Sequence, residues 1–95
     1  MSTTKADYEL RAWLDDDRIE SVVFNIRKPN PDDYIMAKSY IDQGKEFEGV
    51  YLLVKALLIS GDDPIVLRTN LTAYKSVEAL IMKLFKPVEG ELKKI

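Results

Sequence analysis

The alternation of apolar and polar residues near the start of the chain predicts β-strands. Within residues 7–14 every second residue is apolar, and a second apolar run follows within residues 19–28. A period of two is typical of strands that bury one face. The runs are separated by Asp15-Asp16-Asp17-Arg18, where consecutive aspartates favour a turn. We therefore expect an antiparallel β-hairpin; the alternative is a helix in which Ala12 and Leu14 pack at helical spacing.

Two prolines mark the change from strands to helices. In Pro29-Asn30-Pro31 each proline lacks an amide donor and disfavours the α conformation in the residue before it, so the second strand ends here. Asn30 suits an N-cap, Pro31 suits the first helical position, and Asp32 and Asp33 complement the helix dipole. A helix is expected from Pro31 to just before Gly44. Its inner stripe consists of Tyr34, Ala37, Tyr40 and Ile41.

The second half of the chain predicts two further long helices. Residues from Glu46 to Ser60 are apolar nearly all round and predict the central helix, with Gly61 as a left-handed cap. Asp63 and Pro64 suit the start of a single turn over residues 65–68. The last helix has apolar residues at steps of three and four and ends before Pro87. Its stripe comprises Leu71, Tyr74, Val77, Leu80, Ile81, Leu84 and Phe85.

These elements predict an α+β fold in which an N-terminal β-hairpin is followed by a bundle of about three α-helices. The 95 residues are expected to form a single domain. Within it we expect a flexible N-terminus at residues 1–6, the hairpin at 7–28, a helical part at 31–86 and a C-terminal tail at 88–95. The tail either frays or docks through Leu92 and Ile95.

The chain contains neither histidine nor cysteine, which changes the expected chemistry. These are the side chains most used for catalysis and metal ligation near neutral pH, so we expect no enzyme and no cofactor. The net charge of −2 disfavours binding to nucleic acid or anionic membranes. The run from Val50 to Ile59 is about half the length of a membrane span. A polar start without a secretory signal makes a cytoplasmic protein the simplest interpretation.

Clustered aspartates are the remaining candidates for metal chemistry. Asp15 and Asp17 at the hairpin tip, with Asp62 and Asp63, could serve a metal-dependent enzyme. A solvated tip and helix capping explain these residues better, because the spacing lacks the ligands and glycine of an EF-hand loop. The sequence Gly61-Asp62-Asp63 also occurs in viral RNA polymerases, but the proline that follows favours a cap. No catalytic, cofactor-binding or metal-ligating residue is therefore predicted.

Three large side chains fit the apolar stripes least well. Trp13 departs from the strand alternation and is expected on the other face of the sheet, where helices or a partner pack. Tyr51 and Met82 also stand apart from their helical stripes. Large apolar side chains outside the core often mark interaction sites. We therefore predict Trp13, Tyr51 and Met82 as partner-binding residues on an exposed apolar patch.

The order of elements resembles that of small bacteriophage and prophage morphogenesis proteins, most closely the tail assembly chaperones. Four segments carry the resemblance: a strand ending Val23-Phe24-Asn25-Ile26-Arg27-Lys28-Pro29, a helix opening Asn30-Pro31-Asp32-Asp33-Tyr34, an apolar helix closing Leu58-Ile59-Ser60-Gly61-Asp62, and a terminal helix ending Leu84-Phe85. Proteins of this family bind the long tape-measure protein and keep it soluble while the tail tube assembles. The resemblance assigns no contact residue.

The leading functional hypothesis is a non-enzymatic, protein-binding tail assembly chaperone. Its partner would be a tape-measure-like or other phage structural protein, in the bacterial host cytoplasm, and the chain itself would be able to form homo-oligomers. The alternative is a small regulatory binding protein of the antitoxin or host-takeover inhibitor type, whose partner is one folded protein. A metal-dependent enzyme that uses the aspartates ranks below both.

Overall fold

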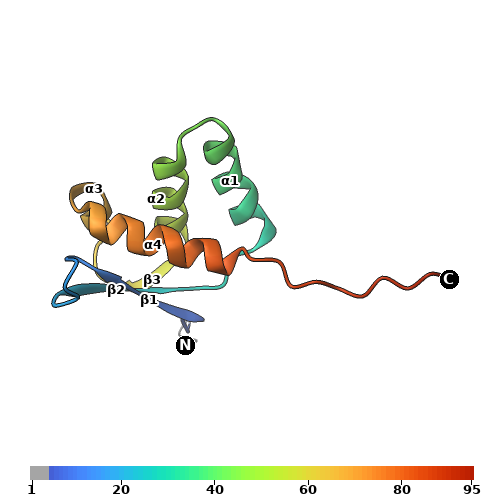
Figure 1. Cartoon of the computed structure of the whole chain (residues 1–95), viewed down its shortest axis with the longest axis horizontal. Coiled ribbons are helices and arrows are strands. Elements are labelled where there is room, and N and C mark those ends of the chain that lie inside the picture. Colours follow the sequence, from blue (N-terminus) through green and yellow to red (C-terminus); the bar gives the residue numbers. More distant parts are fainter. Residues whose placement is uncertain (1–4) are drawn as a thin grey trace, which may run out of the picture.

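A computed structural model describes residues 5–95, in which a three-stranded antiparallel sheet carries all the helices on one face (Figure 1). The strand order is β1 (Tyr8–Trp13), β2 (Ser21–Ile26) and β3 (Leu58–Gly61). Four helices complete the fold: α1 (Pro31–Asp42), α2 (Glu46–Leu57), α3 (Val66–Thr69) and α4 (Leu71–Leu84). The predicted α+β class is confirmed. Most of the predicted flexible N-terminus, residues 1–4, lies outside the described residues.

The predicted β-hairpin is present, with Leu10 opposite Phe24 in the antiparallel register. Its turn is organised by Asp15, whose carboxylate accepts hydrogen bonds from the backbone N–H groups of Ile19 and Glu20 at 3.0 and 2.9 Å. These two donors hold the pKa of the Asp15 carboxyl below its ordinary value. Arg18 adopts a left-handed conformation, with φ of 58°, which completes the reversal. A helix over residues 7–14 is therefore excluded.

A capping box and an ion pair join β2 to α1. The Asn30 side chain accepts a hydrogen bond from the Asp33 N–H at 3.0 Å, and the Asp33 carboxylate accepts one from the Asn30 N–H at 2.8 Å. The carboxylate also accepts hydrogen bonds from both terminal nitrogens of Arg27, at 2.7 and 3.1 Å. The Arg27 hydrogen bonds lower the pKa of Asp33. The predicted helix start at Asn30-Pro31 is confirmed, and Asp33 has a further role at the junction.

The prediction of one helix from Glu46 to Ser60 is wrong beyond Leu57. Leu58–Gly61 instead forms β3 against the outer edge of β2. An element that is apolar nearly all round carries no periodicity that separates helix from strand. The free edge of β2 decides in favour of a strand. Its backbone N–H and C=O groups need hydrogen-bond partners once they are buried, and residues 58–61 supply them as β3.

Gly61 does not cap a helix, because it lies in β3, paired with Phe24 of β2 in the antiparallel register. Its φ is +114°, a conformation that favours glycine, and a Cβ atom added there would collide with the Val23 carbonyl oxygen. The next residue extends the pairing: the Asp62 N–H donates to the Val23 oxygen, and the Asp62 carboxylate accepts from the Val23 N–H, both at 2.8 Å. The Asp62 carboxylate thus takes the place of a backbone carbonyl and adds one more hydrogen bond to the β2–β3 pairing.

The helices bury the inner face of the sheet. α4 packs over β1, while α1 and α2 form an antiparallel pair that stands beside it (Figure 1). Asn70 caps α4 by accepting a hydrogen bond from the Ala73 N–H at 2.9 Å, a cap that the sequence analysis did not identify. The largest fully buried side chains are Phe24, Ile26, Leu53, Leu57, Leu67, Ile81, Val50, Val54 and Val77.

The predicted tail is extended and projects away from the body of the molecule (Figure 1). Its apolar side chains are the most exposed large hydrophobic residues in the described part of the chain: Val88 is 96% exposed, Leu92 99% and Ile95 121%. The body of the domain therefore ends close to Pro87.

Gly61→Ala should destabilise the fold by roughly 3 kcal/mol, because a methyl group would collide with the Val23 carbonyl and the residue would keep a strained φ. The measurement is the free energy of unfolding in urea. Gly44→Ala is the matched control: Gly44 has a φ of +78° but nothing within 4 Å of an added Cβ, so its cost should be only about 1 kcal/mol. Equal costs for the two variants would mean that the contact at Val23 contributes nothing.

Asp33→Asn should destabilise the protein at neutral pH by about 1 kcal/mol or more, because it weakens a cap and an ion pair. The lowered pKa of Asp33 gives stability that is present above its unfolded value, near 3.8, and is lost as the pH falls through the folded pKa. The difference in unfolding free energy between wild type and variant should therefore shrink between pH 7 and about pH 2. Asp32→Asn, which removes the same charge one residue away, should show a smaller difference; equal pH profiles would contradict the assignment.

Candidate protein-binding groove

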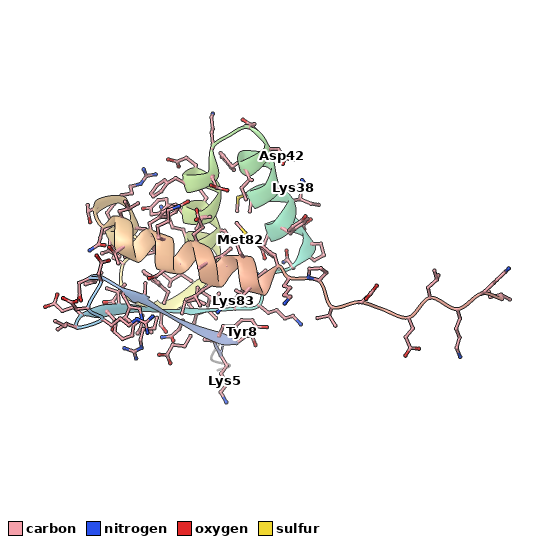
Figure 2. All side chains as sticks on the ribbon, in the orientation of Figure 1. Lys5, Tyr8, Lys38, Asp42, Met82 and Lys83 are labelled. Carbon is pink, nitrogen blue, oxygen red and sulfur yellow. The ribbon has the colours of Figure 1, made fainter. Side chains whose placement is uncertain are left out.

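An apolar groove opens between α1, α2 and the C-terminal end of α4. Its cavity volume is about 550 Å³. Figure 2 shows Met82 on α4 in front of the α1 and α2 pair, with Lys38 and Asp42 on α1 beyond it. We refer to this feature as the groove. Its lining consists of Tyr34, Ala37, Lys38, Ile41, Asp42, Val50, Leu53, Ile81, Met82, Lys83, Phe85, Lys86 and Pro87.

A glycine sets the spacing of the two helices that form one side of the groove. At Gly49 in α2 a Cβ atom would lie 3.0 Å from the Ala37 carbonyl oxygen and 3.3 Å from the Tyr40 Cβ atom of α1. The missing side chain therefore lets the helices approach closely at this level. Val50 and Leu53, on the same helix, are buried at the floor of the groove.

An aromatic pair closes one end of the groove and separates it from a second hollow. The rings of Tyr34 and Phe85 meet edge to face, with centroids 5.3 Å apart. The second hollow, of about 380 Å³, lies on the other side of this pair and is lined by Tyr8, Lys28, Pro29, Asn30, Pro31, Tyr34, Leu84 and Phe85. Tyr34 is 45% exposed, although its position on the predicted inner stripe of α1 suggested burial.

The charges around the groove are mainly positive. Lys38, Lys83 and Lys86 line it, against one acidic residue, Asp42. Asp42 pairs with Lys38 one turn away along α1, at 3.2 Å. Lys83 and Lys86 form no salt bridge within the described part of the chain. The end of α4 therefore offers cations beside an apolar floor.

The structure separates the three residues predicted to bind a partner. Met82 is 43% exposed and lines the groove. Trp13 is half-buried opposite Ser21, on the sheet face that also carries Glu9 and Arg11 and that is turned away from the helices. Tyr51 is only 6% exposed, so the expectation that it lies on an exposed patch is wrong.

Tyr51 is buried by neighbours that the sequence did not bring together. Its ring stacks on Phe47 at 5.7 Å between centroids, and the Arg68 guanidinium lies 4.3 Å from its centre. Arg68 also pairs with Glu48 at 3.2 Å. One turn of helix in α3 supplies this arginine, and neither periodicity nor spacing indicated that it would reach α2.

Of the four candidate metal ligands, Asp15, Asp62 and Asp63 accept hydrogen bonds from backbone N–H groups, and the described aspartates form no metal-binding cluster. Asp15 accepts hydrogen bonds in the hairpin turn, Asp62 accepts one from β2, and Asp63 accepts one from the Ile65 N–H at 3.0 Å at the start of α3. Within residues 5–95, no group of three or more acidic side chains is placed to hold a metal ion.

Comparisons of the chain with protein-family models, with curated proteins and with solved structures found no match. Among residues 5–95, every helix falls short of the length and apolar content needed to cross a bilayer. The groove and the residues around it are therefore the features of the described chain that bear on function.

Adding Mg²⁺ or Ca²⁺ at about 10 mM should leave the melting temperature unchanged within about 1 °C, because a ligand stabilises a protein only by binding its folded form. The control is sodium chloride at the same ionic strength, which reproduces the screening of exposed charges. A rise specific to the divalent ion, lost in Asp15→Asn or Asp62→Asn, would instead favour the metal-dependent enzyme.

Proposed function

We propose that this chain is a non-enzymatic protein-binding module that takes an amphipathic helix with acidic flanks into its groove. The observation that carries the proposal is the apolar groove of about 550 Å³ between α1, α2 and α4, with cations at its margin. A helix whose apolar face enters a hydrophobic groove is a recurring mode of protein recognition. The groove offers an incoming helix the side chains of three helices, α1, α2 and α4.

The distribution of polar groups favours a protein segment over a small molecule. A small-molecule site generally combines an apolar cavity with a few polar groups that orient the ligand. In the described residues, no buried side-chain nitrogen or oxygen lacks a hydrogen-bond partner. The charged residues of the lining, Lys38, Asp42, Lys83 and Lys86, are all exposed. An apolar centre with a polar, exposed rim is the composition of a protein interface.

The more specific proposal is a tail assembly chaperone whose partner is a long, helical tape-measure protein. It is supported by the resemblance of the strand, proline and helix order, and by a groove that could receive successive helical segments of one partner. The partner would then carry several copies of this chain. One folded partner at equal stoichiometry would instead favour a regulatory protein of the antitoxin or inhibitor type.

A synthetic amphipathic helix of about 18 residues, with leucines on one face and glutamates beside them, should bind saturably in a fluorescence anisotropy titration. Met82→Glu should weaken this binding at least about tenfold, because the groove would then have to bury a carboxylate. Ile19→Glu is the matched control, since Ile19 is 78% exposed in the hairpin turn and should leave binding unchanged.

A second peptide tests the charge argument separately. Replacing its glutamates by lysines should reduce the affinity about tenfold, because the lysines would be repelled by Lys83 and Lys86. Added salt should then weaken binding of the glutamate peptide and strengthen binding of the lysine peptide. Equal binding of the two peptides would remove the acidic flank from the proposal. Binding that Met82→Glu leaves intact would place the interaction elsewhere and overturn the proposal.

A further inference from the structure

We propose that the segment Pro87–Ile95 of one copy of this chain docks as a short helix in the groove of a second copy. The inference rests on the groove being an acceptor for helices, as proposed above, but names a different occupant. The apolar pattern of the segment is the first observation. Val88, Leu92 and Ile95 stand at positions i, i+4 and i+7, the spacing of one helical face, and all three are almost fully exposed.

The polar residues of the segment also suit a helix. Pro87 fits a first helical position, Glu89 and Glu91 fall in the N-terminal part, and Lys93 and Lys94 fall in the last turn, where each charge complements the dipole. A helix of this length is marginal by itself in water, and Gly90 weakens it further. The segment is therefore extended when alone and gains its helix by docking.

The charges of such a helix match those of the groove. At about 100° per residue, Glu89 and Glu91 flank the apolar face on its two sides, while Lys93 and Lys94 point away from it. The groove presents Lys83 and Lys86 beside its apolar floor, and Lys38 stands on the margin formed by α1. The acidic residues that flank the apolar face of the segment thus complement the lysines at the rim of the groove.

The route of the chain favours a second copy over the segment's own groove. Pro87 is itself part of the groove lining, so the helix would begin where its own acceptor ends. The residue before a proline is pushed toward extended backbone, which carries the chain outward without a turn. In Figure 1 the segment accordingly leaves α4 roughly along its axis and points away from the α1 and α2 pair. A reversal at Gly90 would leave too few residues to present all three apolar side chains.

Sedimentation velocity on the full chain should show a concentration-dependent dimer with a dissociation constant in the micromolar range, because the interface is small. Leu92→Asp should weaken the dimer at least about tenfold by placing a charge on the docking face. Met82→Glu, in the groove, should do the same. Ile19→Asp, which alters an exposed apolar residue in the hairpin turn, should leave the dimer intact.

Mixing the two defective proteins provides the decisive measurement. The Leu92→Asp protein has an unaltered groove, and the Met82→Glu protein has an unaltered segment. The mixture should therefore form a heterodimer in which the segment of the Met82→Glu protein docks in the groove of the Leu92→Asp protein. Circular dichroism should show a gain of helix on association. A chain that stays monomeric to about 1 mM, or a dimer that persists in Leu92→Asp, would overturn the proposal.

The amphipathic peptide separates this inference from the proposed function. If the segment occupies the groove, Leu92→Asp should bind the peptide more tightly than the wild type does, because its groove is no longer contested. A peptide that binds both proteins equally, with no dimer, would retain the proposed function and reject the docked segment. A dimer that responds to both variants, with no peptide binding, would retain the docked segment and reject the proposed function.

Discussion

The close contact of Gly61 with Val23 is the constraint on which the arrangement of the molecule depends. It lets β3 lie against β2, where Asp62 continues the pairing through its own carboxylate. Because β3 directly follows α2 and precedes α3, the contact fixes where both helices leave the sheet. The α1 and α2 pair and the start of α4 are thereby positioned on the same face of the sheet.

The groove results from the contacts that hold α1 to β2 and α2 to α1, and from the course of α4 over the sheet. The Arg27 and Asp33 pair holds the beginning of α1 to the end of β2, and Gly49 sets α2 close to α1. α4 crosses the sheet over β1 and brings Met82 and Phe85 toward α1. Three helices thus meet around an apolar hollow that none of their side chains fills. The function proposed here follows from that unfilled space.

The parts of the fold that depend on local chemistry could be predicted from the sequence. Alternation in the hairpin, the Asn30-Pro31 helix start and the α4 periodicity each determine a structure within a few residues. β3 could not be predicted, because its selection depends on the unpaired edge of β2, more than thirty positions earlier in the chain. Among the candidate binding residues, Met82 is exposed, as its place outside the apolar stripe of α4 suggested. The burial of Tyr51 depends on Arg68 from another helix, which no spacing rule brings to it.

Tyr34 and Phe85 form a single wall shared by the groove and the second hollow. A molecule that turns either ring in order to enter one space changes the shape of the other at the same time. Occupancy of the two spaces would then be thermodynamically linked, and each occupant would alter the affinity of the other by the same factor. The domain would thereby gain two mutually responsive sites from one pair of aromatic rings.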